Sequence, residues 1–298
     1  MSYEQQQIRA LAVWRGQLPV GLVLSGRLAP VVSFMERMVP LPVLQAGLEG
    51  ACGLGERLAS PGTVLELSGV GSIAALRDGG LELCDRLANR THDRAIALAA
   101  AEGGITGAAG LVGVVLDIPG LMTLSLRTIY QIGLCYGFEL SGEEGRQLVL
   151  RILGLAGANT IKEKEAALFS LAALRQVLAH QSLGPIRQAA VSAFGREATM
   201  AALRDAAMQV GLRLGRRKAA NLVPVVGAAL GGMINAGFVR DVGWAARRTF
   251  QSMWLEGVSL SGLGQDDLAS RFPTAAEFNF AFSQNTGPSA VVKAAGVE

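Results

Sequence analysis

The stretch from Gly103 to Leu124 reads GGITGAAGLVGVVLDIPGLMTL. It decides the fold because it is apolar and rich in glycine, yet it contains Asp117 and Pro119. Its uncharged part ends at Leu116, short of the roughly 20 residues that a membrane-spanning helix needs. A single span would also place an aspartate in hydrocarbon, at a cost of about 3 kcal/mol. We therefore expect two helices that meet at Asp117, which would cap the second helix while Pro119 lies in its first turn.

The glycines of this stretch recur every three or four positions, as Gly103, Gly107 and Gly110 show. Each glycine costs a helix about 1 kcal/mol relative to alanine, so a compensating role in packing is expected. Glycines at this spacing leave one helix face bare, and a second helix can then approach backbone to backbone. A later segment, NLVPVVGAALGGMINAGFVRD, carries Gly227 and Gly231 in the same way. We expect the two glycine-rich segments to pack against each other.

Signals for helix starts and ends recur along the whole chain and predict an all-α fold. Half of the 298 residues are hydrophobic, and stretches with alternating strand patterns are scarce. Breaks rich in glycine and proline fall near residues 59–62, 137–141, 183–185 and 260–265. We predict a single multi-helix domain over residues 1–283 and a flexible tail over 284–298. Capping boxes of the S/T-x-x-E/Q type begin at Ser2, Thr63, Ser141, Thr160 and Thr274.

Positive charge gathers beside the second glycine-rich segment. Such a cluster can bind the phosphates of anionic lipid, or it can be an ordinary solvated helix face, and the sequence leaves both open. Aromatic residues make up only 5% of the chain and no nucleic-acid-binding motif is present, so nucleic acid is not an expected partner. The cluster comprises Arg213, Arg216, Arg217 and Lys218, and Arg240 follows the next apolar run.

The residue pattern offers little support for an enzyme. Cys52, Cys84 and Cys135 are widely spaced, which is typical of buried free thiols, and no spacing typical of a metal site is present. A G-x-G-x-x-A spacing at residues 69–74 lacks the surrounding βαβ units of a dinucleotide-binding site. Glu102, Asp117 and Arg127 could form a polar cluster at the glycine-rich helices. We interpret it as structural pairing in an apolar environment, and a hydrolase-like site is the alternative.

The run AEGGITGAAGLVGVVLDIPGLMTLSLRTIYQIGLCYGFEL, residues 101–140, resembles the signature of the EcsC protein family. It contains the family's E-G-x-x-T-G-x-x-G run, then D-x-P, L-x-L-R-x-I and a Y-G turn. The later KAANLVPVVGAALGGMIN, residues 218–235, is similar to the family's second block. The similarity covers roughly residues 30–260. It implies an accessory role at a membrane, linked to ABC transport or protein secretion, and it supplies no catalytic residues.

Taken together, the sequence predicts a non-enzymatic, cytoplasmic protein that associates with the inner face of the plasma membrane. The start of the chain lacks the pattern of a secretory signal. Peripheral or amphitropic binding to an anionic membrane surface is expected, and a membrane protein such as a transporter is a further expected partner. No cofactor or metal is expected. The alternatives are the hydrolase-like enzyme and a soluble helical interaction module.

Overall fold

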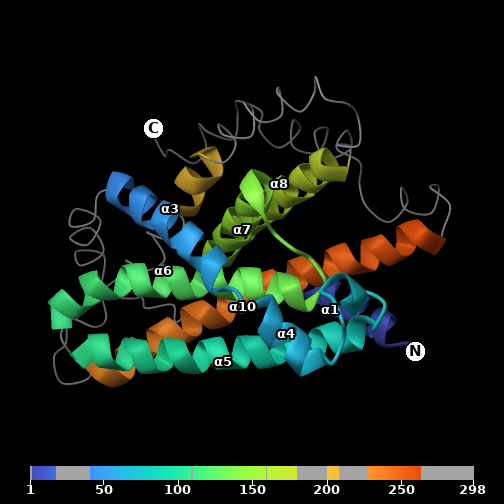
Figure 1. The fold of residues 1–298 in the computed structure, drawn as a ribbon. Helices are drawn as coiled ribbons and strands as arrows, with labels where there is room; N and C mark the ends of the chain where they lie inside the picture. The colour runs from blue at the N-terminus through green and yellow to red at the C-terminus, as the bar shows by residue number, and fades with distance from the viewer. Residues whose placement is uncertain are drawn as a thin grey trace, which may run out of the picture. The chain divides into compact units, whose positions relative to one another are not determined.

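A computed structural model describes residues 2–17, 41–108, 110–158, 160–179, 200–207 and 227–262. The described residues form helices joined by turns and contain no β-strand, which confirms the predicted all-α fold (Figure 1). The helices are α1 (Tyr3–Arg15), α3 (Leu41–Leu58), α4 (Pro61–Ser68), a short 3-10 turn (Ala74–Leu76), α5 (Leu81–Ala108), α6 (Gly110–Cys135), α7 (Gly142–Gly157), α8 (Ile161–Ala179) and α10 (Gly227–Gly262).

Several helix boundaries follow local sequence signals. Ser2 caps α1 in a complete capping box with Gln5, as predicted. The predicted break at residues 59–62 lies between α3 and α4, but α4 starts earlier than the Thr63 box suggests. Its N-cap is Ser60, because the serine hydroxyl accepts from the Thr63 amide and Pro61 occupies the first turn. The break at residues 137–141 separates α6 from α7.

The prediction that a helix begins at Asp117 is wrong. Helix α6 begins at Gly110 and continues through Asp117 and Pro119 to Cys135. A proline inside a helix removes one backbone hydrogen bond and costs about 3 kcal/mol. Packing outweighs this cost, because α6 contacts α3, α4, α5 and α7. Helix α5 ends at Ala108 and α6 begins at Gly110, so the boundary between the two helices lies earlier than Asp117, in a stretch whose glycine content lowers helix propensity.

Helix α6 is the central element of the core. It runs antiparallel to α5, since Tyr136, the residue after α6, contacts Asp85 near the start of α5, and Gly120 of α6 contacts Glu102 near the end of α5 (Figure 1). Helix α3 crosses the other side of α6 and places Gly55 against the backbone of Leu126 and Arg127. A Cβ atom at Gly55 would lie 2.8 Å from the Arg127 amide nitrogen, so only glycine permits this approach.

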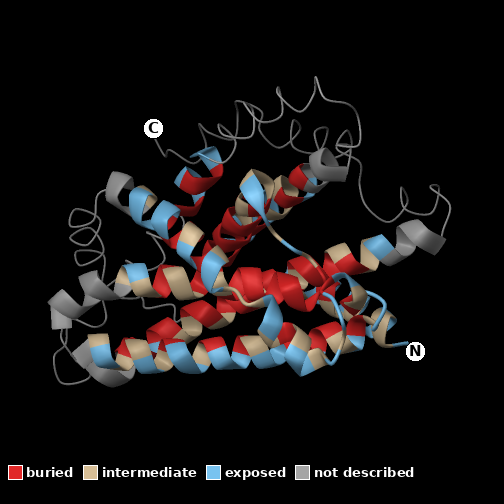
Figure 2. Cartoon of the chain, in the orientation of Figure 1, coloured by how far each residue is buried: buried red, intermediate tan, exposed pale blue. Residues whose placement is uncertain are grey.

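The apolar core lies between α6, α7 and α10. Leu126, Ile129 and Ile132 of α6 are buried, and so is nearly every residue of α7 from Gln147 to Gly157 (Figure 2). Phe250 of α10 stacks on Tyr136 at a centroid distance of 6.4 Å. The three cysteines are buried and free, as predicted.

Helices α7 and α8 form a second hairpin, and a lysine of α8 binds the C-terminal end of α1. Lys164 of α8 is buried, and its Nζ donates hydrogen bonds to the carbonyl oxygens of Trp14 and Gln17. The ammonium group also lies 3.9 Å from the centroid of the Trp14 ring. Burial lowers the pKa of Lys164 to about 8. A lysine on α8 thus satisfies carbonyl groups at and beyond the C-terminal end of α1.

By its internal contacts the chain divides into two units, Met1–Trp254 and Leu255–Glu298. Most of the second unit lies outside the described residues, so the predicted boundary at residue 283 and the predicted tail remain predictions. The capping site at Thr274 and the break near residue 183 also lie outside them. None of the helices within the described ranges has an apolar stretch long enough to cross a membrane.

Candidate functional site

The two glycine-rich segments meet where α5 approaches its end and α10 begins. A Cβ atom on Gly103 would collide with the carbonyl oxygen of Gly231 and would lie 2.7 Å from the Asn235 side-chain nitrogen. One residue further along α10, a Cβ atom on Gly232 would lie 2.7 Å from the carbonyl oxygen of Ala100. The backbones of α5 and α10 therefore touch at Gly103 and Gly231, which agrees with the predicted packing of the two glycine-rich segments.

This contact lies within a region of three helices that is almost free of charge. We call it the apolar end and define it as residues 99–108 of α5, 110–123 of α6 and 227–239 of α10. Glu102 and Asp117 are its only charged residues. Among the side chains of this region that the structure describes, two large hydrophobic ones face outward: Ile105 is 76% exposed and Met233 is 59% exposed. Both of these exposed apolar side chains therefore lie in helix segments that carry very few charges.

The structure does not bring Glu102 and Arg127 together. The Glu102 carboxylate lies against the backbone of α6 at Gly120, where it fills the space that a side chain would need. Arg127 lies two helical turns further along α6, about 10 Å away along the axis. Its Nε donates to the carbonyl oxygen of Leu58 at the end of α3, over 3.1 Å. Asp117 lies within α6, but its side chain is not among those that the structure describes.

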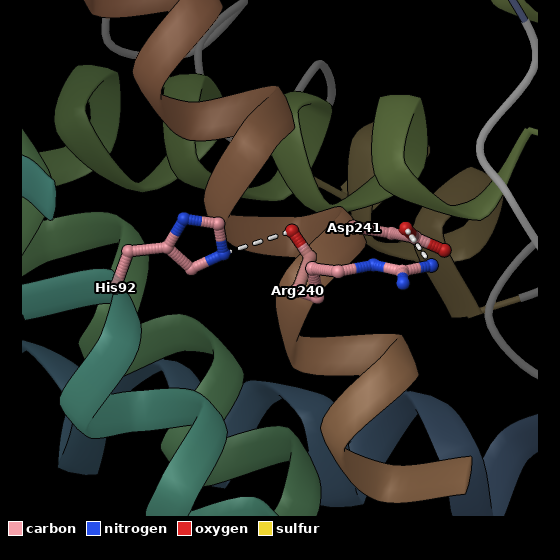
Figure 3. A network of polar contacts seen from close by, with 3 residues as sticks. All are labelled: His92, Arg240 and Asp241. Carbon is pink, nitrogen blue, oxygen red and sulfur yellow. Dashed lines mark hydrogen bonds and ion pairs between the residues drawn. The ribbon is translucent and has the colours of Figure 1, made fainter. Parts of the chain in front are cut away.

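Arg240 lies in the middle of α10 and is part of a small polar contact with α5 (Figure 3). Its side chain is 41% exposed and pairs with Asp241 over 3.4 Å. Its carbonyl oxygen lies 2.9 Å from Nε2 of His92. Because a carbonyl oxygen only accepts hydrogen bonds, Nε2 carries the imidazole proton and donates it.

His92 is a buried residue in the interior of α5. Its ring fits over Gly243, where a Cβ atom would collide with the imidazole. It also meets Trp244 edge to face at 5.9 Å. Burial, and secondarily the charge of Arg247, lower the pKa of His92 to about 4. The neutral ring is therefore a structural link between α5 and α10.

A buried polar cluster that the sequence did not indicate lies at the opposite end of α5. Asp85 is 2% exposed and accepts hydrogen bonds from side chains of α1, of α10 and of the residue that follows α6. Tyr3 of α1 donates to its Oδ2 over 2.7 Å, and Tyr136, which follows the last residue of α6, donates to its Oδ1. Gln251 of α10 donates to both oxygens, over 3.1 and 2.9 Å.

Further polar side chains surround this cluster. Arg248 donates to Gln251 over 2.6 Å and to Gln7 of α1 over 3.2 Å, and Gln251 donates to Gln7 over 3.1 Å. Burial and the nearby Asp85 carboxylate raise the pKa values of Tyr3 and Tyr136 above their ordinary value. Both phenols consequently remain protonated donors, and the cluster ties α1, α5, α6 and α10 together. We interpret it as structural, because its carboxylate is enclosed by side chains that already bind it.

Of the other predicted site residues, Gly107 lies in α5, Gly110 begins α6 and Gly227 begins α10, but the surroundings of all three lie outside the described set. The basic cluster also lies outside the described residues, so its lipid contact remains a prediction; it comprises Arg213, Arg216, Arg217 and Lys218. Within the described part of the chain, no group of three or more His, Cys, Asp or Glu side chains is placed to hold a metal ion.

Comparison with known proteins gives a family and one relative. The family model described as the EcsC protein family matches residues 5–255. The chain is 22% identical over 171 residues to the protein of Bacillus subtilis (strain 168) described as "Uncharacterized protein YdbA". The matched region covers 57% of this chain and 58% of that relative, less than two thirds of its length. No solved structure matches the chain.

Proposed function

Because this chain belongs to the EcsC protein family, as its two sequence blocks predicted, we propose that it is a membrane-associated helical accessory protein of that type. In this proposal it binds the inner face of the plasma membrane peripherally and reversibly. Its task is to bind a membrane surface, or a protein embedded in it such as a transporter, rather than to catalyse a reaction.

The observation that carries the proposal is the apolar end of α5, α6 and α10. Ile105 and Met233 expose large apolar side chains there, within three helix segments that contain only two charged residues. An interfacial helix buries its apolar face about 5 to 10 Å into the boundary between headgroups and acyl chains. The apolar end could enter that boundary without placing a cluster of charges in hydrocarbon.

The position of Arg240 agrees with such an orientation. It follows Met233 by seven residues, which is about 10 Å along a helix axis. With Met233 in the acyl boundary, the partly exposed Arg240 side chain would lie at the depth of the lipid phosphates. A basic residue near an anionic surface contributes about 1 kcal/mol to binding. The basic cluster at residues 213–218 would add to this attraction.

Flotation with liposomes tests the proposal, using the full chain and the variant Met233→Glu. Val13→Glu is the matched control, because Val13 is also 59% exposed but lies on α1, away from the apolar end. Each protein is mixed with neutral or anionic vesicles at low and high salt. We expect wild type and Val13→Glu to float with anionic vesicles, whereas Met233→Glu floats at least several-fold less. A glutamate in the acyl boundary is costly, and the added negative charge is the same in both variants.

A second variant separates the two parts of the interaction. Removing the charges of Arg213, Arg216, Arg217 and Lys218 should weaken flotation at low salt and have little further effect at high salt, where charges are screened. If wild type fails to float under every condition, or if Met233→Glu and Val13→Glu float equally, the apolar end is not a membrane contact. The soluble interaction module would then be the better interpretation.

A further inference from the structure

A groove opens between α4, α5 and α6, outside the apolar end. It encloses a cavity of about 400 Å³, within the range of small-molecule sites. One wall is a face of α5, the other wall is α4, and α6 forms the floor. The lining residues are Thr63, Leu67, Arg90, Thr91, Asp93, Arg94, Ala95, Leu98, Leu124, Arg127, Thr128 and Gln131.

The groove carries excess positive charge. Three arginines line it against a single carboxylate, that of Asp93. Arg90 and Arg94 lie one turn apart on α5, so both side chains project from the same helix face. In the part of the chain that the structure describes, neither of them has an ion-pair or hydrogen-bond partner. Their charges are thus available to an anion that enters the groove.

Arg127 supplies the third charge from the floor, and it is held in place. Its Nε is used by the Leu58 carbonyl oxygen, which fixes one edge of the guanidinium group and leaves the terminal nitrogens for another acceptor. An arginine fork that is already oriented suits phosphate and carboxylate groups, which accept two parallel hydrogen bonds. The ordering cost of binding is then lower than for a freely rotating side chain.

Part of the groove is apolar, and three threonines lie among its other lining residues. Leu67 of α4 and Leu98 of α5 are each 46% exposed, although both line the cavity, and Ala95 and Leu124 extend the same surface. Below them Gln131 is not available to a ligand, because its amide exchanges two hydrogen bonds with the Ser60 backbone. The groove therefore offers positive charge on one part of its surface and apolar side chains on another.

We propose that this groove binds an amphiphilic anion, with a phosphate-type head between Arg90, Arg94 and Arg127 and an alkyl chain against Leu67 and Leu98. A membrane phospholipid and a free alkyl phosphate share this chemistry. The inference does not depend on the proposed membrane association, because the groove and the apolar end have no residue in common.

Titration calorimetry with octyl phosphate, below the concentration at which it forms micelles, tests the proposal on the full chain. Inorganic phosphate and the neutral octyl glucoside are the two reference ligands. The variant Arg90→Gln/Arg94→Gln removes two of the three charges. Arg86→Gln is the matched control, because Arg86 lies one turn before Arg90 on the same helix but does not line the groove. Circular dichroism confirms that each variant is folded.

We expect octyl phosphate to bind wild type and Arg86→Gln alike, and the double variant at least about tenfold more weakly, since two charge-assisted contacts are lost. Inorganic phosphate and octyl glucoside should each bind at least about tenfold more weakly than octyl phosphate. Equal affinity for inorganic phosphate and octyl phosphate would overturn the proposed contact of the alkyl chain with Leu67 and Leu98. The absence of octyl phosphate binding, or an equal loss in Arg86→Gln, would overturn the site.

Vesicles identify the source of the ligand. Competition by phosphatidic acid vesicles against octyl phosphate would indicate a membrane lipid, whereas unchanged octyl phosphate binding would indicate a free amphiphile. Met233→Glu distinguishes this inference from the proposed membrane association. That variant should bind octyl phosphate as wild type does, even though its flotation is reduced.

Discussion

Replacing Gly103 by alanine tests the contact between α5 and α10. The added methyl group would collide with the Gly231 carbonyl oxygen and would lie 2.7 and 2.8 Å from two side-chain atoms of Asn235. Overpacking of this kind costs about 1 to 3 kcal/mol. Alanine also gains about 1 kcal/mol over glycine in a helix. We therefore expect Gly103→Ala to lower the free energy of unfolding by up to about 2 kcal/mol.

Gly50→Ala provides the matched control for this substitution. Gly50 lies inside α3 and is exposed, with no atom within 4 Å of the position that a Cβ would occupy. The same gain in helix propensity applies, but the collision does not, so this variant should be about 1 kcal/mol more stable than wild type. Because the propensity cancels, the difference between the two variants measures the steric cost alone.

Urea unfolding followed by circular dichroism gives both free energies. We expect the two variants to differ by about 1 to 3 kcal/mol, with wild type between them. A difference below about 0.5 kcal/mol would refute the reasoning, because ordinary surface substitutions fall within that range. It would mean that the backbones of α5 and α10 leave room for a side chain at Gly103.

Three further predictions concern the polar contacts. His92, whose pKa is about 4 when folded and near its ordinary value of 6.5 when unfolded, stabilises the fold fully above pH 6.5 and loses this contribution as the pH falls towards 4. Between pH 8 and pH 5 the urea-unfolding free energy should fall by about 2 kcal/mol more in wild type than in His92→Gln, and equal pH profiles would contradict the assignment. Tyr136→Phe removes one donor from the buried Asp85 carboxylate and should lower the free energy of unfolding by about 1 to 3 kcal/mol, whereas no loss would show that the phenol does not bind Asp85. Lys164→Met should release the end of α1, so that limited proteolysis cuts within residues 3–17 earlier than in wild type, and an unchanged cleavage pattern would argue against this role of the lysine.

Local signals explain what the sequence could predict of the fold. The Ser2 capping box and the glycine- and proline-rich breaks after Leu58 and Cys135 depend on neighbouring residues, and the structure confirms them. Asp117 and Pro119 gave an equally clear local signal that was wrong. There the contacts of α6 with four other helices outweigh the cost of an internal proline. The residues next to Pro119 in the sequence do not indicate that these contacts will form.

The parts of the candidate site also differ in whether the sequence contains a pattern that predicts them. The packing of the two glycine-rich segments was predictable, because repeated small residues mark a helix face that another backbone can approach, although the pairing of Gly103 with Gly231 was not. The Asp85 cluster was not, since Tyr3, Tyr136 and Gln251 are single polar residues with no periodic pattern. They lie 82, 51 and 166 positions away from Asp85. The groove needs three helices in place before its arginines converge.

The bonds between α1 and α10 also constrain how the chain is made. Gln7 is bound by Gln251, which lies 244 positions later. At a synthesis rate of about 5 to 20 residues per second, the ribosome needs roughly 10 to 50 s to deliver the second partner after the first. During that interval the hydrogen-bond partners of α1 on α10 have not yet been made. The N-terminal helix is therefore among the first parts of the chain to be translated and among the last to complete its native contacts.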